Sequence, residues 1–215
     1  MTESEALEAG VGETQDGGAK LRQIMDGARA VFLSAGFDGA SMNDIARGAG
    51  VSKGTLYAYF DSKVDLFEAI IREMRAEQAE RHCAVSPELG DARAVLTDFG
   101  VRLMEKITNP ERIALARLVI AAAGKFPRLG RAFYEAGPAY GARRLAAELV
   151  ALERAGALKV PDAERAATQF VDLCQSGLFK RVLFAMVDSV SREEIEAAVG
   201  AGVDVFLAAY GVKTA

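Results

Sequence analysis

The sequence predicts an all-α protein of about nine helices, with a small N-terminal three-helix unit followed by a larger helical region. Three observations support this fold class. Apolar residues recur at spacings of three and four, which is typical of amphipathic helices. Helix-start signals, such as Ser or Asp caps and Pro at the first helical position, recur along the chain. No segment shows the apolar–polar alternation of a half-buried strand.

The composition favours a folded chain of one or two domains. The chain has 215 residues, of which 51% are hydrophobic, so a sizeable core can form. No apolar run reaches the ~18 residues that a transmembrane helix needs. The first segment is acidic and has no signal-peptide pattern. We therefore expect a cytoplasmic protein with no membrane partner.

Residues that usually carry catalysis or metal binding are scarce. Cys83 and Cys174 follow no metal or redox spacing, and His82 is the only histidine. His82 and Cys83 are adjacent, and adjacent side chains on a helix point away from a shared ligand. No Ser/His/Asp, Cys/His or phosphate-loop arrangement is present. We expect no catalytic residue, no metal and no cofactor, and therefore no enzyme.

The chain is expected to begin with a disordered acidic tail over residues 1–19. This segment holds five acidic residues and no Lys or Arg, and its hydrophobicity is low. The first helix should run from about Lys20 to Ala35, where apolar residues recur at helical spacing. Gly36 should end it.

Two short helices joined by a tight turn are predicted over SMNDIARGAGVSKGTLYAYF, which begins at Ser41. Ser41 should cap the first of them, and Gly50 allows the backbone conformation that ends it. Ser52 should cap the second, whose Leu56 and Phe60 share one face. The pattern predicts a helix-turn-helix, and the alternative is an αα-hairpin that only packs.

The other faces of the second short helix carry hydrogen-bonding and cationic side chains. They are Lys53, Thr55, Tyr57 and Tyr59. Side chains of these kinds contact phosphates and base edges in DNA. This helix is therefore a candidate to enter the major groove.

Further helix starts follow at intervals. A fourth helix should begin after Ser62, which forms a capping pair with Asp65, and should run toward Cys83. Later starts are marked by Ser86-Pro87-Glu88, Asn109-Pro110-Glu111, Phe126-Pro127, Val160-Pro161-Asp162 and Ser191-Arg192-Glu193-Glu194.

Three helix ends or breaks are also predicted. The helix that starts at Phe126 should break or kink near Gly137-Pro138. The helix that starts at Asp162 should be long and reach about Asp188. The last helix should end near Gly211.

The run from Ala30 to Ile70 resembles the N-terminal domain of the tetracycline-repressor (TetR) family of transcriptional regulators. The matching residues are Phe32, Gly36, Phe37, Ser41, Asp44, Ile45, Ala46, Ala49 to Ser52, Gly54 to Tyr57, Tyr59, Phe60, Ser62, Lys63, Leu66 and Phe67. The resemblance implies a DNA-binding domain over residues 20–65, in which Lys63 holds a DNA phosphate. The expected DNA-binding residues are Ser41, Met42, Ser52, Lys53, Gly54, Thr55, Tyr57, Tyr59 and Lys63.

The resemblance extends less specifically to residues 66–215. The stretch KFPRLGRAFYEAGP, from Lys125 to Pro138, is similar to one in the AcrR- and AefR-like subgroup of that family. Members use this half to dimerise through the last two long helices and to hold a small molecule. The resemblance thus implies a homodimeric repressor that binds a palindromic DNA operator. An apolar or amphipathic effector, whose identity is unknown, would release it.

Two helical stripes near the C-terminus are candidates for the dimer interface, because small residues in them permit close helix crossing. Their residues are Ala166, Phe170, Leu173, Gly177, Val199, Gly202, Val203 and Phe206. Ordinary packing inside one chain is the alternative interpretation.

Aromatic and apolar residues of the second half are candidates to line an effector site, since such sites are mostly apolar. They are Phe99, Met104, Phe126, Phe133, Tyr134, Tyr140 and Phe170. A packed core is the alternative for each of them.

The charge balance constrains the regulatory hypothesis. The formal net charge is −4, and residues 20–65 hold six Lys or Arg against five acids, so the placement of charge must matter more than its sum.

The helix that starts at Lys63 is the element expected to couple effector binding to DNA affinity. The alternative function is an effector-independent DNA-binding protein whose C-terminal half binds a protein partner.

Overall fold

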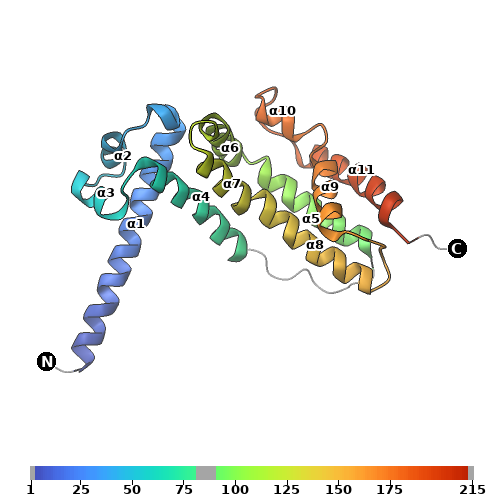
Figure 1. Cartoon of the computed structure of the whole chain (residues 1–215), viewed down its shortest axis with the longest axis horizontal. Coiled ribbons are helices and arrows are strands. Elements are labelled where there is room, and N and C mark those ends of the chain that lie inside the picture. The colour runs from blue at the N-terminus through green and yellow to red at the C-terminus, as the bar shows by residue number, and fades with distance from the viewer. Residues whose placement is uncertain (1–2, 81–90, 213–215) are drawn as a thin grey trace. The chain divides into compact units, whose positions relative to one another are not determined.

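The computed structural model describes residues 3–80 and 91–212, with side chains from 17 to 73 and from 91 to 212. Within these ranges the regular elements are helices, as the sequence predicts. The chain forms two compact units (Figure 1). The N-terminal unit comprises residues 1–76 and 118–133, and the C-terminal unit comprises residues 77–117 and 134–215.

Four helices open the N-terminal unit. They are α1 (Glu3–Gly39), α2 (Met42–Gly48), α3 (Lys53–Tyr59) and α4 (Lys63–Glu80). α2 packs against α1, and α3 packs against α2 (Figure 1). Ile24, Ile45 and Leu56, one from each of these three helices, are fully buried. On α4, Phe67 meets Phe32 of α1 edge to face, with ring centroids 4.9 Å apart.

The capping and turn residues of the helix-turn-helix adopt the predicted geometry. The Ser41 hydroxyl oxygen accepts a hydrogen bond from the Asp44 backbone N–H at 3.2 Å. The Ser52 hydroxyl oxygen accepts one from the Thr55 backbone N–H at 3.0 Å. Gly50 has a φ of 63°, in the left-handed region that glycine adopts without steric cost. The predicted caps and turn are confirmed.

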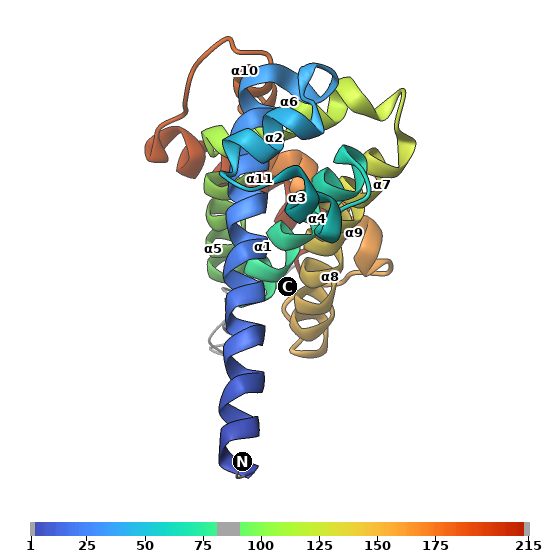
Figure 2. The same cartoon turned by 90° about the vertical axis from the view of Figure 1, so that its left-hand side faces the viewer.

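α1 differs from the prediction at its start and agrees with it at its end. Residues 3–19 are helical rather than a disordered tail, and α1 continues as one long helix toward the N-terminus (Figure 2). A helix already formed lengthens readily through good helix formers such as Ala, Glu and Leu. Acidic residues are also favourable near a helix N-terminus. Gly36, with a φ of 73°, breaks the helical backbone as predicted.

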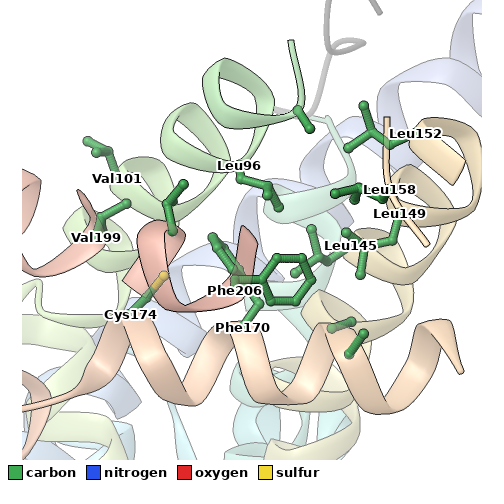
Figure 3. Close-up of a cluster of buried hydrophobic side chains, with 14 of the residues drawn as sticks. Leu96, Val101, Leu145, Leu149, Leu152, Leu158, Phe170, Cys174, Val199 and Phe206 are labelled. Atoms are coloured by element: carbon green, nitrogen blue, oxygen red, sulfur yellow. The ribbon is translucent and has the colours of Figure 1, made fainter. Parts of the chain in front are cut away.

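Seven further helices follow in the described chain. They are α5 (Ala92–Ile107), α6 (Pro110–Ala123), α7 (Pro127–Ala136), α8 (Pro138–Arg154), α9 (Ala163–Gln175), α10 (Phe179–Leu183) and α11 (Arg192–Tyr210). α9 packs against α8, α11 and α5, and α5 also packs against α11. Their shared core includes Leu96, Leu149, Phe170 and Phe206 (Figure 3). The last two form a T-shaped ring pair at 5.2 Å.

Most predicted helix starts are confirmed. Pro110, Pro127 and Pro138 open α6, α7 and α8. Asp162 caps α9, and Ser191 forms the expected capping box at the start of α11. The predicted start at Ser86-Pro87-Glu88 lies outside the described residues. In the described chain, α5 begins at Ala92 and Asp91 caps it.

The long helix predicted to reach Asp188 is interrupted. α9 ends at Gln175, and Gly177 has a φ of 80°, which an α-helix cannot accommodate. A short α10 follows this break. The apolar pattern continues through the break, and it therefore predicted one helix where there are two.

The boundary between the two units differs from the domain boundary that the sequence predicts at residue 65. The N-terminal unit continues along α4 to residue 76 and includes residues 118–133, which hold the end of α6 and most of α7. One reason is an aromatic contact, because Phe126 packs edge to face on Phe37 at 5.1 Å. The α6–α7 connection thus belongs with the helix-turn-helix.

Because α1 and α2 cross closely, we expect that one methyl group added at this crossing destabilises the fold. A Cβ added at Gly27 would lie 2.4 Å from the Cα of Ala49, which is backbone and cannot rotate away. Gly27→Ala should therefore destabilise the chain by about 1–3 kcal/mol or more, as overpacked sites do. Urea unfolding followed by circular dichroism measures this.

Gly141→Ala is the matched control, because Gly141 lies in α8 and an added Cβ there meets nothing within 4 Å. It should stabilise the chain by about 0.5–1 kcal/mol, the usual gain for Gly to Ala inside a helix. Equal unfolding midpoints for the two variants would contradict the close-crossing argument.

Candidate nucleic-acid interface

α3 is fixed on one side and exposed on the other. Leu56 is its buried residue, and Ser52 holds its first turn through the Thr55 N–H and, at 2.8 Å, the Thr55 hydroxyl. Lys53 is exposed, and Tyr57 and Tyr59 keep 51% and 39% of their surface in solvent. An ammonium, a hydroxyl and two phenols on one anchored helix suit contacts with phosphates and base edges.

α2 adds a second exposed group of polar side chains. Ser41 is exposed at its N-terminus, where its hydroxyl donates to Asp44 at 2.5 Å and its oxygen accepts from the Asp44 N–H. The Ser41 hydrogen bond and the neighbouring Arg47 lower the pKa of Asp44. Arg47 is exposed and pairs with Asp44 at 2.6 Å. Met42 is only half-buried.

Arg47 was not among the DNA-binding residues that the sequence predicted, although its position in the sequence indicates an exposed cation. It lies three residues after Asp44, in the last turn of the helix that precedes the turn. A cation there is favoured by the helix dipole and remains at the exposed edge of the motif.

The other expected DNA-binding residues on α2, α3 and the turn lie on or beside exposed positions of the motif. Gly54, for example, is exposed in the first turn of α3.

Lys63 has a different set of partners from the expected phosphate. Its ammonium donates to three backbone carbonyls, at 2.7 Å to Phe37, 3.2 Å to Asp38 and 2.9 Å to Ala40. It also lies 4.8 Å from the centroid of the Phe37 ring. A lysine ammonium has three donors, and these three bonds use them all.

The position of Lys63 now has a physical explanation. A cation in the first turn of α4 is unfavourable for the dipole of α4 itself, but it is favourable at the carbonyl end of α1. Carbonyls at a helix end lack intrahelical hydrogen-bond donors, and the Lys63 ammonium provides donors for them. In this structure Lys63 joins the start of α4 to the end of α1 and to Ala40 before α2, and its expected contact with a DNA phosphate stays a prediction.

The residues predicted to line an effector site are divided between the two units. Phe126 and Phe133 belong to the N-terminal unit. Met104 and Phe170 are fully buried in the core of the C-terminal unit, against which Phe99 is packed. Tyr134 is exposed, and Tyr140 is half-buried.

The predicted dimer stripes are largely core of the chain itself. Ala166, Phe170, Val199, Gly202, Val203 and Phe206 are buried, Leu173 is half-buried and Gly177 is exposed. α9 and α11 bury these stripes against each other and against α5. The alternative interpretation, packing inside one chain, is therefore the correct one for the buried members.

A different apolar surface is exposed on the C-terminal unit. We call it the α11 outer face; its residues are Ala197, Ala201, Val205 and Ala208. Val205 is 56% exposed, and beyond the end of α10 Phe184 and Met186 are 72% and 74% exposed. Ala185 between them has a φ of 54°, an uncommon backbone for alanine. The sequence signal was that α11 is apolar on more than one face.

Metal and membrane features are not found in the described part of the chain. No group of three His, Cys, Asp or Glu side chains is placed to hold a metal ion there. Burial raises the pKa of the Cys174 thiol to about 12, so it stays protonated at neutral pH. None of the described helices is both long and apolar enough to cross a membrane.

Two family models match the chain. Residues 24–70 match the model described as "Bacterial regulatory proteins, tetR family". Residues 94–212 match "AefR-like transcriptional repressor, C-terminal domain". The two matches together cover both compact units.

Similar curated proteins are transcriptional regulators. The chain is 38% identical over 72 residues to the HTH-type transcriptional repressor Rv1474c of Mycobacterium tuberculosis, covering 34% of this chain and 36% of the relative. It is 29% identical over 110 residues to the HTH-type transcriptional regulator AcrR of Shigella flexneri, covering 50% and 51%. The matches thus span a third to a half of these relatives.

Similar solved structures cover more of the chain. A TetR-family transcriptional regulator from Mesorhizobium loti has a TM-score of 0.78 and 30% identity, covering 91% of this chain and 98% of the other. The Flavonoid-responsive Regulator FrrA has a TM-score of 0.79 and 34% identity, covering 92% and 100%. The helical arrangement is therefore similar over nearly the whole chain.

The carbonyl contacts of Lys63 predict that its removal harms the fold. Lys63→Met keeps an apolar stem beside Phe37 but leaves the three carbonyls without this donor. It should reduce the free energy of unfolding by about 1–3 kcal/mol, as expected for lost hydrogen bonds to a charged group. Urea unfolding measures the effect.

Lys53→Met is the control, because Lys53 is exposed on α3 and pairs with no described acid. It should leave stability within about 0.5 kcal/mol of wild type and reduce DNA affinity. The structural role of Lys63 would be refuted if Lys63→Met unfolded like wild type and changed only the salt dependence of DNA binding.

Proposed function

This chain belongs to the TetR family and is a DNA-binding transcriptional regulator, and we propose that it acts as a ligand-responsive repressor. It binds a palindromic operator as a homodimer, and a small effector releases it. One observation carries the DNA-binding half of this proposal: α3 is anchored by Leu56 and Ser52 while its Lys53, Tyr57 and Tyr59 side chains remain exposed. A helix held in this way suits insertion in a major groove.

Within this surface we assign two kinds of contact. Lys53, Thr55 and Tyr57 lie on α3, and we place them near base edges. Ser41 caps α2 and Tyr59 is the last residue of α3, and we assign both to phosphates. Phosphate contacts fix the position of the protein, and base contacts give the sequence preference.

The α11 outer face, together with Phe184 and Met186, is the surface that we propose for dimerisation. Its exposed apolar residues recur at spacings of three and four along one helix, and their small side chains allow a second helix to approach closely. A twofold dimer presents two α3 helices to successive turns of DNA, which increases the number of base pairs that are read.

The effector is proposed to be an aromatic, amphipathic compound held in the C-terminal unit. Support comes from the similarity to a regulator described as flavonoid-responsive. It comes also from aromatic side chains of that unit, since Phe99 and Phe170 lie 6.4 Å apart between ring centroids. Aromatic surfaces with a few polar groups are typical of small-molecule sites.

A second candidate function is supported by one observation. Met104 and Phe170, which were expected to line an effector site, are fully buried in a packed core. A solid C-terminal unit favours an effector-independent DNA-binding protein that binds a protein partner through this half. A ligand screen separates the two candidates.

The operator and the dimer are tested together. Duplexes selected by the wild-type chain from a random-sequence pool should be palindromic, with half-sites about one helical turn or more apart. Val205→Glu places a charge on the α11 outer face, so it should shift the chain toward a monomer in sedimentation and weaken binding to the palindrome.

Ala147→Glu is the control for this charge, because Ala147 is exposed on α8, away from the α11 outer face along the chain. It should sediment and bind as wild type does. An asymmetric selected site, bound by a monomer, would refute the twofold arrangement.

The effector half of the proposal predicts a reciprocal coupling. Flavonoids and other amphipathic aromatic compounds are screened by thermal shift, and each hit is titrated with and without the selected duplex. DNA should weaken effector binding by the factor by which the effector weakens DNA binding, about 5–150-fold. Hits with equal affinities in both titrations would refute the coupling, and the absence of hits would favour the effector-independent candidate.

A further inference from the structure

The connection between α6 and α7 has no role in the function proposed above. We call residues 124–128, Gly-Lys-Phe-Pro-Arg, the 124–128 loop; they comprise this connection and the first two residues of α7. It opens the stretch whose resemblance to the AefR-like subgroup was noted in the sequence. It lies in the N-terminal unit, together with the helix-turn-helix.

Both cations of the 124–128 loop are paired with acids of that unit. Lys125 contacts Asp38 at 2.5 Å. Arg128 contacts Asp65 and also Glu68, the latter at 3.4 Å between Nε and Oε2. The loop thus brings two positive charges to three carboxylates.

These carboxylates flank the DNA-binding helices. Asp38 lies near the end of α1, three residues before Ser41, and Asp65 lies in the first turn of α4, which follows α3. The ammonium of Lys63 donates to the Asp38 carbonyl, so the end of α1 and the start of α4 are adjacent. Asp38 and Asp65 therefore lie on neighbouring segments at the edge of the motif.

The two aspartates carry negative charge at neutral pH, because their pKa values are lowered. The hydrogen bond from Lys125 lowers the pKa of Asp38. Hydrogen bonds from Ser62 and then Arg128 lower the pKa of Asp65. Without the loop, full negative charges would remain beside a surface that must approach DNA phosphates, and like charges repel.

Stability alone does not explain the Lys125–Asp38 pair, whose side chains are 67% and 63% exposed. The Arg128 side chain is 51% exposed, and its partners Asp65 and Glu68 are 39% and 19% exposed. Exposed ion pairs contribute little to folding stability. Their charges nevertheless act on a nearby polyanion over about a Debye length, ~10 Å at 0.1 M salt.

We propose that Lys125 and Arg128 are charge-masking residues for DNA binding. They do not contact DNA; they neutralise Asp38, Asp65 and Glu68 beside α2 and α3, and so raise DNA affinity. The inference rests on DNA binding itself and on neither the effector nor the dimer. Because masking acts on any duplex, a nonspecific polymer tests it independently of the operator.

The experiment measures affinity for poly(dI-dC) duplex as a function of salt concentration. Lys125→Gln with Arg128→Gln should weaken binding by about tenfold, the order expected for two unmasked charges at this range. Adding Asp38→Asn and Asp65→Asn should restore most of the affinity, because the repelling charges are then absent. The thermal midpoint of each variant is recorded alongside.

Arg131→Gln is the matched control, because Arg131 is exposed one turn further along α7 and forms no ion pair with a described residue. It should bind nearly as wild type does. A loss that persists in the fourfold variant, with a salt slope reduced by about 0.9 per removed cation, would show direct phosphate contact and overturn the proposal. A loss that follows the thermal midpoint would overturn it as well, because the pairs would then be structural.

Discussion

The N-terminal unit depends on how the end of α1 is closed. Gly36 interrupts the helical backbone, and α1 ends at Gly39, where carbonyls lack the partners of a helix interior. Lys63 donates to three of these carbonyls from the start of α4. This one ammonium fixes the turn that leads into α2, and α2 in turn supports α3. The exposed surface proposed to contact DNA therefore rests on a half-buried polar contact that lies outside it.

An aromatic cluster surrounds the same contact. Phe37 lies under the ammonium of Lys63, at 5.3 Å from Phe67 and 5.6 Å from Phe32. Phe126, from the 124–128 loop, completes the cluster. A segment that is distant in sequence thus becomes part of the unit that carries the helix-turn-helix. α6 begins and α7 ends in the C-terminal unit, so this segment adds two covalent connections between the units to the one in α4.

The C-terminal unit illustrates how close packing uses up apolar stripes. A Cβ on Gly100 of α5 would lie 2.6 Å from Val199, and one on Gly202 of α11 would lie 3.3 Å from the backbone of α9. These glycines let α5, α9 and α11 approach until their stripes are buried in one core. The α11 outer face stays exposed, and its small residues were not among the dimer residues that the sequence predicted.

The sequence by itself determined the local features of this protein. Ser41, Ser52 and Asp162 cap helices because their side chains reach backbone N–H groups within three residues, and such contacts need no distant partner. The exposed polar face of α3 followed from the same local periodicity. The all-α class and most helix starts were predictable for this reason. The tertiary structure alone decided which distant groups meet: Lys63 with the end of α1, the 124–128 loop with Asp38 and Asp65, and the stripes of α9 and α11 with each other. Periodicity shows that a helix face is apolar, but it cannot show whether its partner is another helix of the same chain or a second molecule, because both burials remove the same surface from water.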